Sequence, residues 1–118
     1  MTELVALLST GKGTWTEVIR IMTGHEWDKI YLITNEFGKE NFKPKENTEL
    51  IVINFEESIE LVIDHIIKHL KERITGTEVA LNLASGSGKE HMALLSALLK
   101  LGVGIRMVTF SINNIKEI

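Results

Sequence analysis

Short runs of wholly apolar residues recur along this chain, and each is followed by a polar or glycine-rich loop. A strand that is apolar at successive positions must be covered on both faces, which is typical of parallel sheets. Helical patterns lie between the runs and would supply the two covering layers. The sequence therefore predicts an α/β fold, a Rossmann-like three-layer sandwich whose sheet is mainly parallel and has five to six strands. The predicted strands are residues 4–8, 29–34, 49–55, 77–84, 105–110 and, as the sixth, 115–118.

Helices are predicted over residues 15–24, 56–74 and 89–101. The pattern at 56–74 places its apolar residues on one face, with acids in the first turn and bases in the last, which suits the helix dipole. Residues 35–47 are polar and contain the only proline, so a helix over 36–41 is left open there. The last helix is apolar on almost every side, and we expect a partner chain to cover one flank of it.

The composition limits the kinds of partner that this chain can have. The 118 residues are enough for one domain, which we take to span residues 1–118. The formal charge of −3 gives no broad positive surface for duplex DNA, so a polyanion would have to bind locally. The chain has no cysteine, which excludes disulfides and thiolate zinc sites and fits a cytoplasmic location. No apolar run is long enough to span a membrane, and the first residues lack a signal-peptide pattern.

Two predicted loops combine small residues with a lysine, one after the first strand and one after the fourth. The small residues would let a ligand approach the backbone, and the N-terminus of the following helix would favour an anion. Lys89 is expected in the first turn of the last helix, where a cation opposes the helix dipole by about 0.3–1 kcal/mol. Local stability therefore does not explain this lysine, whereas a bound phosphate would. The simpler alternative is an ordinary turn with a solvated lysine.

The expected topology brings these two loops together. In the doubly wound strand order 3-2-1-4-5, the first and fourth strands are neighbours, and ligands of open α/β sheets bind at their carboxyl ends. We therefore expect one phosphate-binding site made of both loops, without a cofactor or a metal. Its expected residues are Ser9, Thr10, Gly11, Lys12 and Gly13 from the first loop and Ser85, Gly86, Ser87, Gly88 and Lys89 from the second.

The common nucleotide-binding fingerprints are absent from both loops. Neither satisfies GxxxxGK[ST], because no glycine begins the pattern, which disfavours a P-loop NTPase. The first loop does not read GxGxxG, since Gly11 and Gly13 are followed by Trp15 and Glu17. This disfavours a dinucleotide oxidoreductase.

Other kinds of catalytic site have little support in the sequence. His65 and His69 are four residues apart beside Asp64, but without an HExxH pattern we interpret them as surface histidines and not as metal ligands. Ser9 could act as a nucleophile only with a positioned base, and no histidine is predicted there. The strand ends also lack the acidic cluster that metal-assisted phosphoryl transfer needs.

Two segments, LSTGKGT after the first strand and LNLASGSGKEHMALLSALLKLG around the fourth, resemble the CARF domains, which are CRISPR-associated Rossmann-fold ligand sensors. The resemblance covers nearly the whole chain by the order of its elements, but only these two motifs are specific. It implies a homodimer that binds a cyclic oligoadenylate, such as cyclic tetra- or hexa-adenylate, across its two-fold axis. The lysine loops of both subunits would grip the phosphates and riboses.

The resemblance also implies roles for individual residues. Some relatives are ring nucleases that cleave the bound ring without metal, by orienting a ribose 2′-hydroxyl in line with the adjacent phosphate. Ser9 or Thr10 together with Lys89 match the catalytic pattern of those relatives. The pocket residues carried over are Ser9 and Thr10 from the first loop and Gly86, Ser87, Gly88 and Lys89 from the second.

Several functions remain open at this point. The ring could be only bound or also cleaved, and the chain could be a stand-alone protein or the ligand domain of a longer one, for which the polar tail SINNIKEI would suit a junction. An alternative is the ligand-binding domain of a nucleotide-responsive transcriptional regulator whose DNA-binding domain is absent here. A third reading is a structural dimerisation domain with no ligand.

Overall fold

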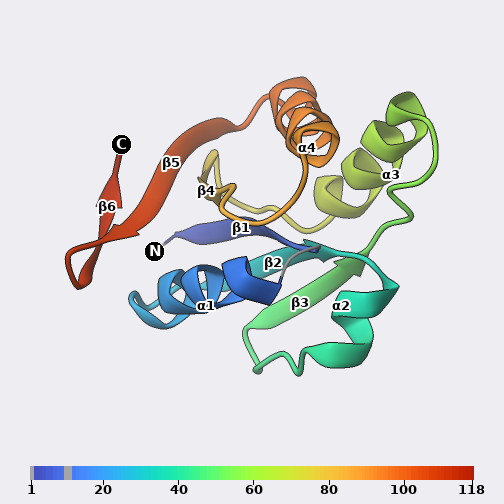
Figure 1. The fold of residues 1–118 in the computed structure, drawn as a ribbon. Helices are drawn as coiled ribbons and strands as arrows, with labels where there is room; N and C mark the ends of the chain where they lie inside the picture. Colours follow the sequence, from blue (N-terminus) through green and yellow to red (C-terminus); the bar gives the residue numbers. More distant parts are fainter. Residues whose placement is uncertain (1, 10–11) are drawn as a thin grey trace.

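A six-stranded sheet forms the centre of the computed structural model, which describes residues 2–9 and 12–118 (Figure 1). The strand order is β3-β2-β1-β4-β5-β6, and all neighbouring pairs are parallel except β5 with β6. The predicted α/β fold, a Rossmann-like three-layer sandwich, is thereby confirmed. The strands are β1 (Glu3–Leu8), β2 (Lys29–Thr34), β3 (Thr48–Val52), β4 (Glu78–Asn82), β5 (Gly104–Ser111) and β6 (Asn114–Glu117).

Helices cover both faces of the sheet. Figure 1 shows α1 and α2 on one face and α3 and α4 on the other. The helices are α1 (Trp15–Thr23), α2 (Glu36–Asn41), α3 (Ile59–Lys71) and α4 (Gly88–Leu101), and a short 3-10 helix (Lys12–Thr14) precedes α1. Within the described residues, no helix is long and apolar enough to cross a lipid bilayer.

The first strand shows why a continuous apolar run predicted a covered strand. Leu4, Ala6 and Leu8 are fully buried in the core beneath α1. Val5 and Leu7 are fully buried in the core beneath α3 and α4. Side chains of a strand alternate between its two faces, so both faces of β1 are apolar because both are covered.

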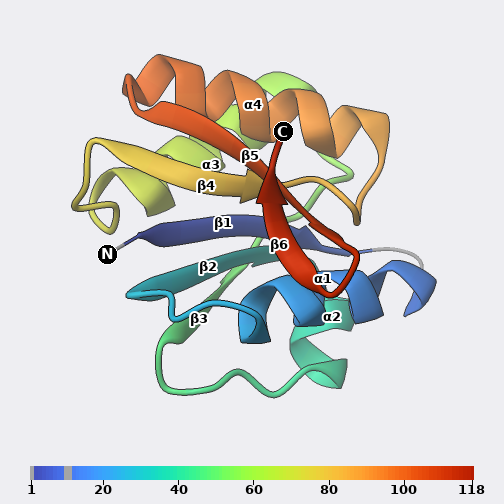
Figure 2. The same ribbon diagram turned by 90° about the vertical axis from the view of Figure 1, so that its left-hand side faces the viewer.

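Several predicted boundaries shift, since the third strand ends at Val52 and the fourth at Asn82, and two further shifts have a local reason. The helix expected over 56–74 begins only at Ile59, because Ser58 caps it and its side chain accepts a hydrogen bond from the Leu61 backbone N–H. At the C-terminus, the turn that separates β5 from β6 contains Ile112 and Asn113, both with positive φ. The final strand therefore starts one residue earlier than predicted, and Figure 2 shows it at a steep angle to β1 and β4.

A buried carboxylate organises the amino ends of β1 and β2, opposite the edge where the loops meet. Glu3 is 7% exposed, and its carboxylate accepts hydrogen bonds from the backbone N–H groups of Thr75 and Gly76, the latter at 2.8 Å. The Tyr31 hydroxyl lies 3.1 Å from Glu3 Oε2 and 2.7 Å from the Arg73 carbonyl oxygen. Burial, and then the Glu3 carboxylate, raise the pKa of Tyr31 to about 12.

Candidate ligand site at the carboxyl ends of the strands

The loops that follow β1 and β4 lie side by side, as the strand order predicted. The pairing of β1 with β4 ends with Ala6 opposite Asn82, and the chains leave the sheet together beyond that point. The Ser9 backbone N–H donates to Ser85 Oγ at 3.2 Å. Both serines are fully buried, so in this conformation their side chains join the loops and do not line an open surface.

Glu90 connects the two loops to the start of α4. Its Oε1 atom accepts hydrogen bonds from the Ser87 backbone N–H at 3.1 Å and from Ser9 Oγ at 2.6 Å. In return, Ser87 Oγ accepts from the Glu90 backbone N–H at 3.3 Å, which completes a capping box. Sequence reasoning missed Glu90, although the Ser-x-x-Glu spacing before an apolar helix is the usual signal for this motif.

The two glycines of the second loop have different structural requirements. Gly86 has a φ of +107°, and a Cβ atom there would come within 2.9 Å of Glu90 Oε1 and 3.0 Å of Leu7 Cδ1. The fold therefore requires a glycine at this position. At Gly88, and at Gly13 in the first loop, no atom of the described residues beyond the chain neighbours and the helix's own backbone lies within 4 Å of the position that a Cβ would take, and φ is not positive. The fold does not explain either of these glycines.

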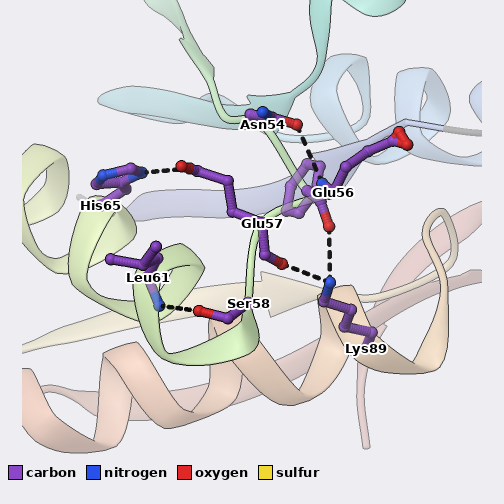
Figure 3. A network of polar contacts seen from close by, with 8 residues as sticks. Asn54, Glu56, Glu57, Ser58, Leu61, His65 and Lys89 are labelled. Carbon is purple, nitrogen blue, oxygen red and sulfur yellow. Dashed lines mark hydrogen bonds and ion pairs between the residues drawn. The ribbon is translucent and has the colours of Figure 1, made fainter.

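Lys89 has a structural partner that the sequence did not predict. Its Nζ atom donates to the backbone carbonyl oxygens of Phe55, at 2.9 Å, and Glu57, at 2.6 Å (Figure 3). Both carbonyls belong to the segment between β3 and α3, so the lysine ties that segment to the start of α4. An ammonium group has three N–H donors, and these contacts use two of them.

The remaining residues of the predicted site fall into two groups. Ser87, Gly88 and Gly13 are exposed, and Gly86 is half-buried, so these positions can be reached from solvent. Thr10 and Gly11, and the side chain of Lys12, lie outside the described residues, so their predicted roles stay predictions. The structure brings Ser9 and Ser85 together but buries both.

An open groove of about 710 Å³ lies beside these loops, at the carboxyl ends of β2 and β3. We call it the Glu90 groove. Three of its residues are acidic, although the sequence predicted no acidic cluster at the strand ends. The described residues nevertheless contain no cluster of His, Cys, Asp or Glu arranged to hold a metal ion. The groove is lined by Asn35, Glu36, Phe37, Val52, Ile53, Asn54, Phe55, Glu56 and Glu90.

The histidines have other partners. His65 Nδ1 lies 3.3 Å from the Glu57 carboxylate, in the network that Figure 3 shows. His91, which the sequence analysis did not single out, lies one residue after Glu90, and its Nε2 atom is 2.9 Å from the Ser85 carbonyl oxygen. That contact supports the second loop from within α4.

The site therefore belongs to a Rossmann-like α/β domain whose strand order reverses between β1 and β4. Comparison with known proteins adds no further identification, because no family model matches the chain and no curated protein matches it significantly.

Proposed function

We propose that this protein is a homodimeric cytoplasmic sensor domain for a cyclic oligoadenylate, of the CARF kind, which acts in CRISPR defence. The observation that carries the phosphate-binding part is the pair Gly13 and Gly88, one in each loop, which the fold does not require. Small residues with open space beside them allow a phosphate to approach the backbone closely. The identity of the ligand as an oligoadenylate is supported by the resemblance of the two loop motifs.

The start of α4 offers donors to a phosphate. Among the described residues, none accepts a hydrogen bond from the backbone N–H of Gly88 or of Lys89. Free N–H groups in a first helical turn attract anions. The third N–H of the Lys89 ammonium is also not used by its two carbonyl partners. These donors would bind the phosphates of the ring.

An exposed apolar stripe on α4 supports the homodimer. Met92 is 60% exposed and Leu99 is 69% exposed, and their spacing of seven residues places them on one face of the helix. The opposite face of α4 is buried against the sheet through residues such as Leu94 and Leu98. A second copy of the chain would cover this stripe across the two-fold axis.

The contacts favour binding over cleavage in this conformation. The Ser9 hydroxyl is buried and donates to Glu90, and Lys89 is held by two carbonyls. Ring cleavage by Ser9 or Thr10 with Lys89 would require these side chains to turn towards the ring. Retention of an intact ring is therefore the expected result.

The experiment incubates the protein with labelled cyclic tetra-adenylate and cyclic hexa-adenylate in the presence of a chelator. A retained, intact ring supports the sensor, and linear products would make the protein a ring nuclease. If neither ring is bound or cleaved, the proposal is wrong. Binding of a different nucleotide in the same assay would favour the regulator domain, and no effect of any nucleotide on the melting temperature would favour a ligand-free dimerisation domain.

A further inference from the structure

We propose that the Glu90 groove binds the adenine base of the ligand and that the second carboxylate oxygen of Glu90, Oε2, selects adenine by accepting a hydrogen bond from its 6-amino group. This inference rests on the proposed function, since it assigns a second part of the same ligand. The phosphates would lie at the start of α4, and the base would lie in the groove.

Glu90 presents one oxygen to the groove. The residue is only 6% exposed, and its Oε1 atom already accepts from Ser9 and Ser87. None of the described residues donates to Oε2, and the described part of the chain has no fully buried side-chain oxygen without a partner. Because Glu90 lines the groove, we assign Oε2 to the groove side of its carboxylate. A donor group of a ligand in the groove would satisfy this oxygen.

This carboxylate is held in a fixed orientation. The capping box fixes it from α4, Ser9 fixes it from the first loop, and Gly86 leaves the space that Oε1 occupies. A rigid acceptor discriminates between ligands better than a mobile one, because the wrong ligand cannot be accommodated by a rotation of the side chain.

The charges of the groove exclude phosphate and favour a neutral, donor-bearing group. Glu36, Glu56 and Glu90 all line the groove, and their negative charges repel an anion. The amino group of adenine is a neutral donor of two hydrogen bonds. Hypoxanthine carries a carbonyl oxygen at the same position, which would face the Glu90 oxygen as a second acceptor.

The rest of the groove suits an aromatic base. Phe37, 47% exposed, and the half-buried Phe55 line it, and exposed aromatic rings are the usual stacking partners of a base. Asn35 and Asn54 each use their side-chain oxygen to accept a backbone N–H, from Gly38 and from Glu56. Their amide nitrogens thus remain as donors for the ring nitrogens of a purine.

The test compares adenosine 5′-monophosphate with inosine 5′-monophosphate, in which a carbonyl oxygen replaces the 6-amino group and N1 carries a proton. We expect the wild-type protein to bind the adenosine nucleotide at least about tenfold more tightly, measured by calorimetry or by NMR titration. The same titration follows the backbone amides of Asn54 and Glu90, which should shift with the base. Equal affinities, no binding of either nucleotide, or shifts confined to other regions would overturn the inference.

The variant Glu90→Gln sharpens the test. Its Oε1 atom can still accept from Ser9 and Ser87, while an amide donor replaces the acceptor that faces the groove. We expect the preference for adenosine monophosphate to disappear or to reverse. The matched control is Glu40→Gln, an exposed residue of α2 outside the groove, which should keep the wild-type preference. An unchanged preference in folded Glu90→Gln would overturn the role of Glu90.

The two proposals can fail separately. If the protein distinguishes the two monophosphates but binds no cyclic oligoadenylate, the base pocket is supported and the proposed function is wrong. If the protein binds the ring but has equal affinity for the two monophosphates, the proposed function is supported and the base pocket is wrong. Spermidine binding in the groove with no nucleotide binding would show a cation site and overturn the inference. If Glu90→Gln does not fold, the affinities of the wild-type protein for the two nucleotides still test whether the groove selects adenine.

Discussion

Ser9 donates its hydroxyl hydrogen bond to Glu90 across 81 positions of the sequence, with an oxygen-to-oxygen distance of 2.6 Å. Both residues are buried, so this contact joins the first loop to the start of α4 without competition from water. Removing the hydroxyl by Ser9→Ala leaves a buried carboxylate with one donor fewer. We expect a loss of about 1.5–3 kcal/mol in the free energy of unfolding, measured with urea. Ser96→Ala on α4 is the control and should cost much less.

Gly86 and Gly88 are expected to respond oppositely to alanine. Gly86→Ala should destabilise the fold by about 1–3 kcal/mol, because its φ is strained for any other residue and the added Cβ meets Glu90. Gly88→Ala should be neutral or stabilise the protein by up to about 1 kcal/mol, since alanine is the better helix residue. Binding of the cyclic ring should nevertheless weaken in Gly88→Ala. A variant that binds normally would show that this glycine is not needed by the ligand.

Lys89→Ala should loosen the segment between β3 and α3. The lysine donates to the Phe55 and Glu57 carbonyls, but it is exposed, so we expect a stability loss below about 1 kcal/mol. Amide hydrogen exchange of residues 55–58 should become faster, and ring binding should weaken. The control is Lys100→Ala, which removes the same charge at the opposite end of α4. It should change neither the amide exchange of residues 55–58 nor the affinity for the ring. Unchanged exchange at 55–58 would contradict the tie that Figure 3 shows.

Tyr31 is the only tyrosine of the chain, so its ionisation can be followed by ultraviolet absorbance without interference from other tyrosines. The phenolate should appear with a midpoint near pH 12, against an ordinary value of 10.0. A raised pKa in the folded state means that the protonated hydroxyl stabilises the fold fully below pH 10 and that this contribution is lost as the pH rises towards 12. In Tyr31→Phe, this part of the decrease in the free energy of unfolding at alkaline pH should be absent. A midpoint near 10 in the folded protein would contradict the buried contact with Glu3.

The proposed dimer can be tested on the apolar stripe of α4. The double change Met92→Lys and Leu99→Lys places two charges on a face that a partner would have to bury. Sedimentation analysis should then show a monomer where the wild type is a dimer. Leu61→Lys is the control, because Leu61 is 47% exposed on α3 and lies outside the stripe. A wild type that is monomeric at high concentration would remove the homodimer from the proposal.

Most of the fold could be predicted because its signals are local. The apolar run of β1 contains its own evidence for burial on both faces, and the alternation of strands with helices implies the strand order that the structure shows. The ends of helices are harder to predict, because the start of α3 depends on one capping residue, Ser58, within a longer helical pattern. The final turn was displaced because Ile112 adopts a conformation that its residue type disfavours.

The site could be predicted only in part. Its position followed from topology, and the small residues marked its two loops. The role of Glu90 was present in the sequence as a capping box, but its contact with Ser9 joins residues distant in the chain and follows from the packing of β1 against β4. The partners of Lys89 are more than 30 positions away and are backbone atoms, which no pattern of side chains reveals.

The carbonyl partners of Lys89 have a consequence for how strongly salt would act on ligand binding. In the described side chains of the two loops, Lys89 is the only cation, and its charge already interacts with two backbone dipoles. Each phosphate contact made by a cation releases about one counterion, so Lys89 would add about one counterion per subunit to the salt dependence of ring binding. Because two carbonyl oxygens hold its ammonium in place, this lysine would meet a phosphate in one fixed direction, as a directed donor more than as a mobile charge.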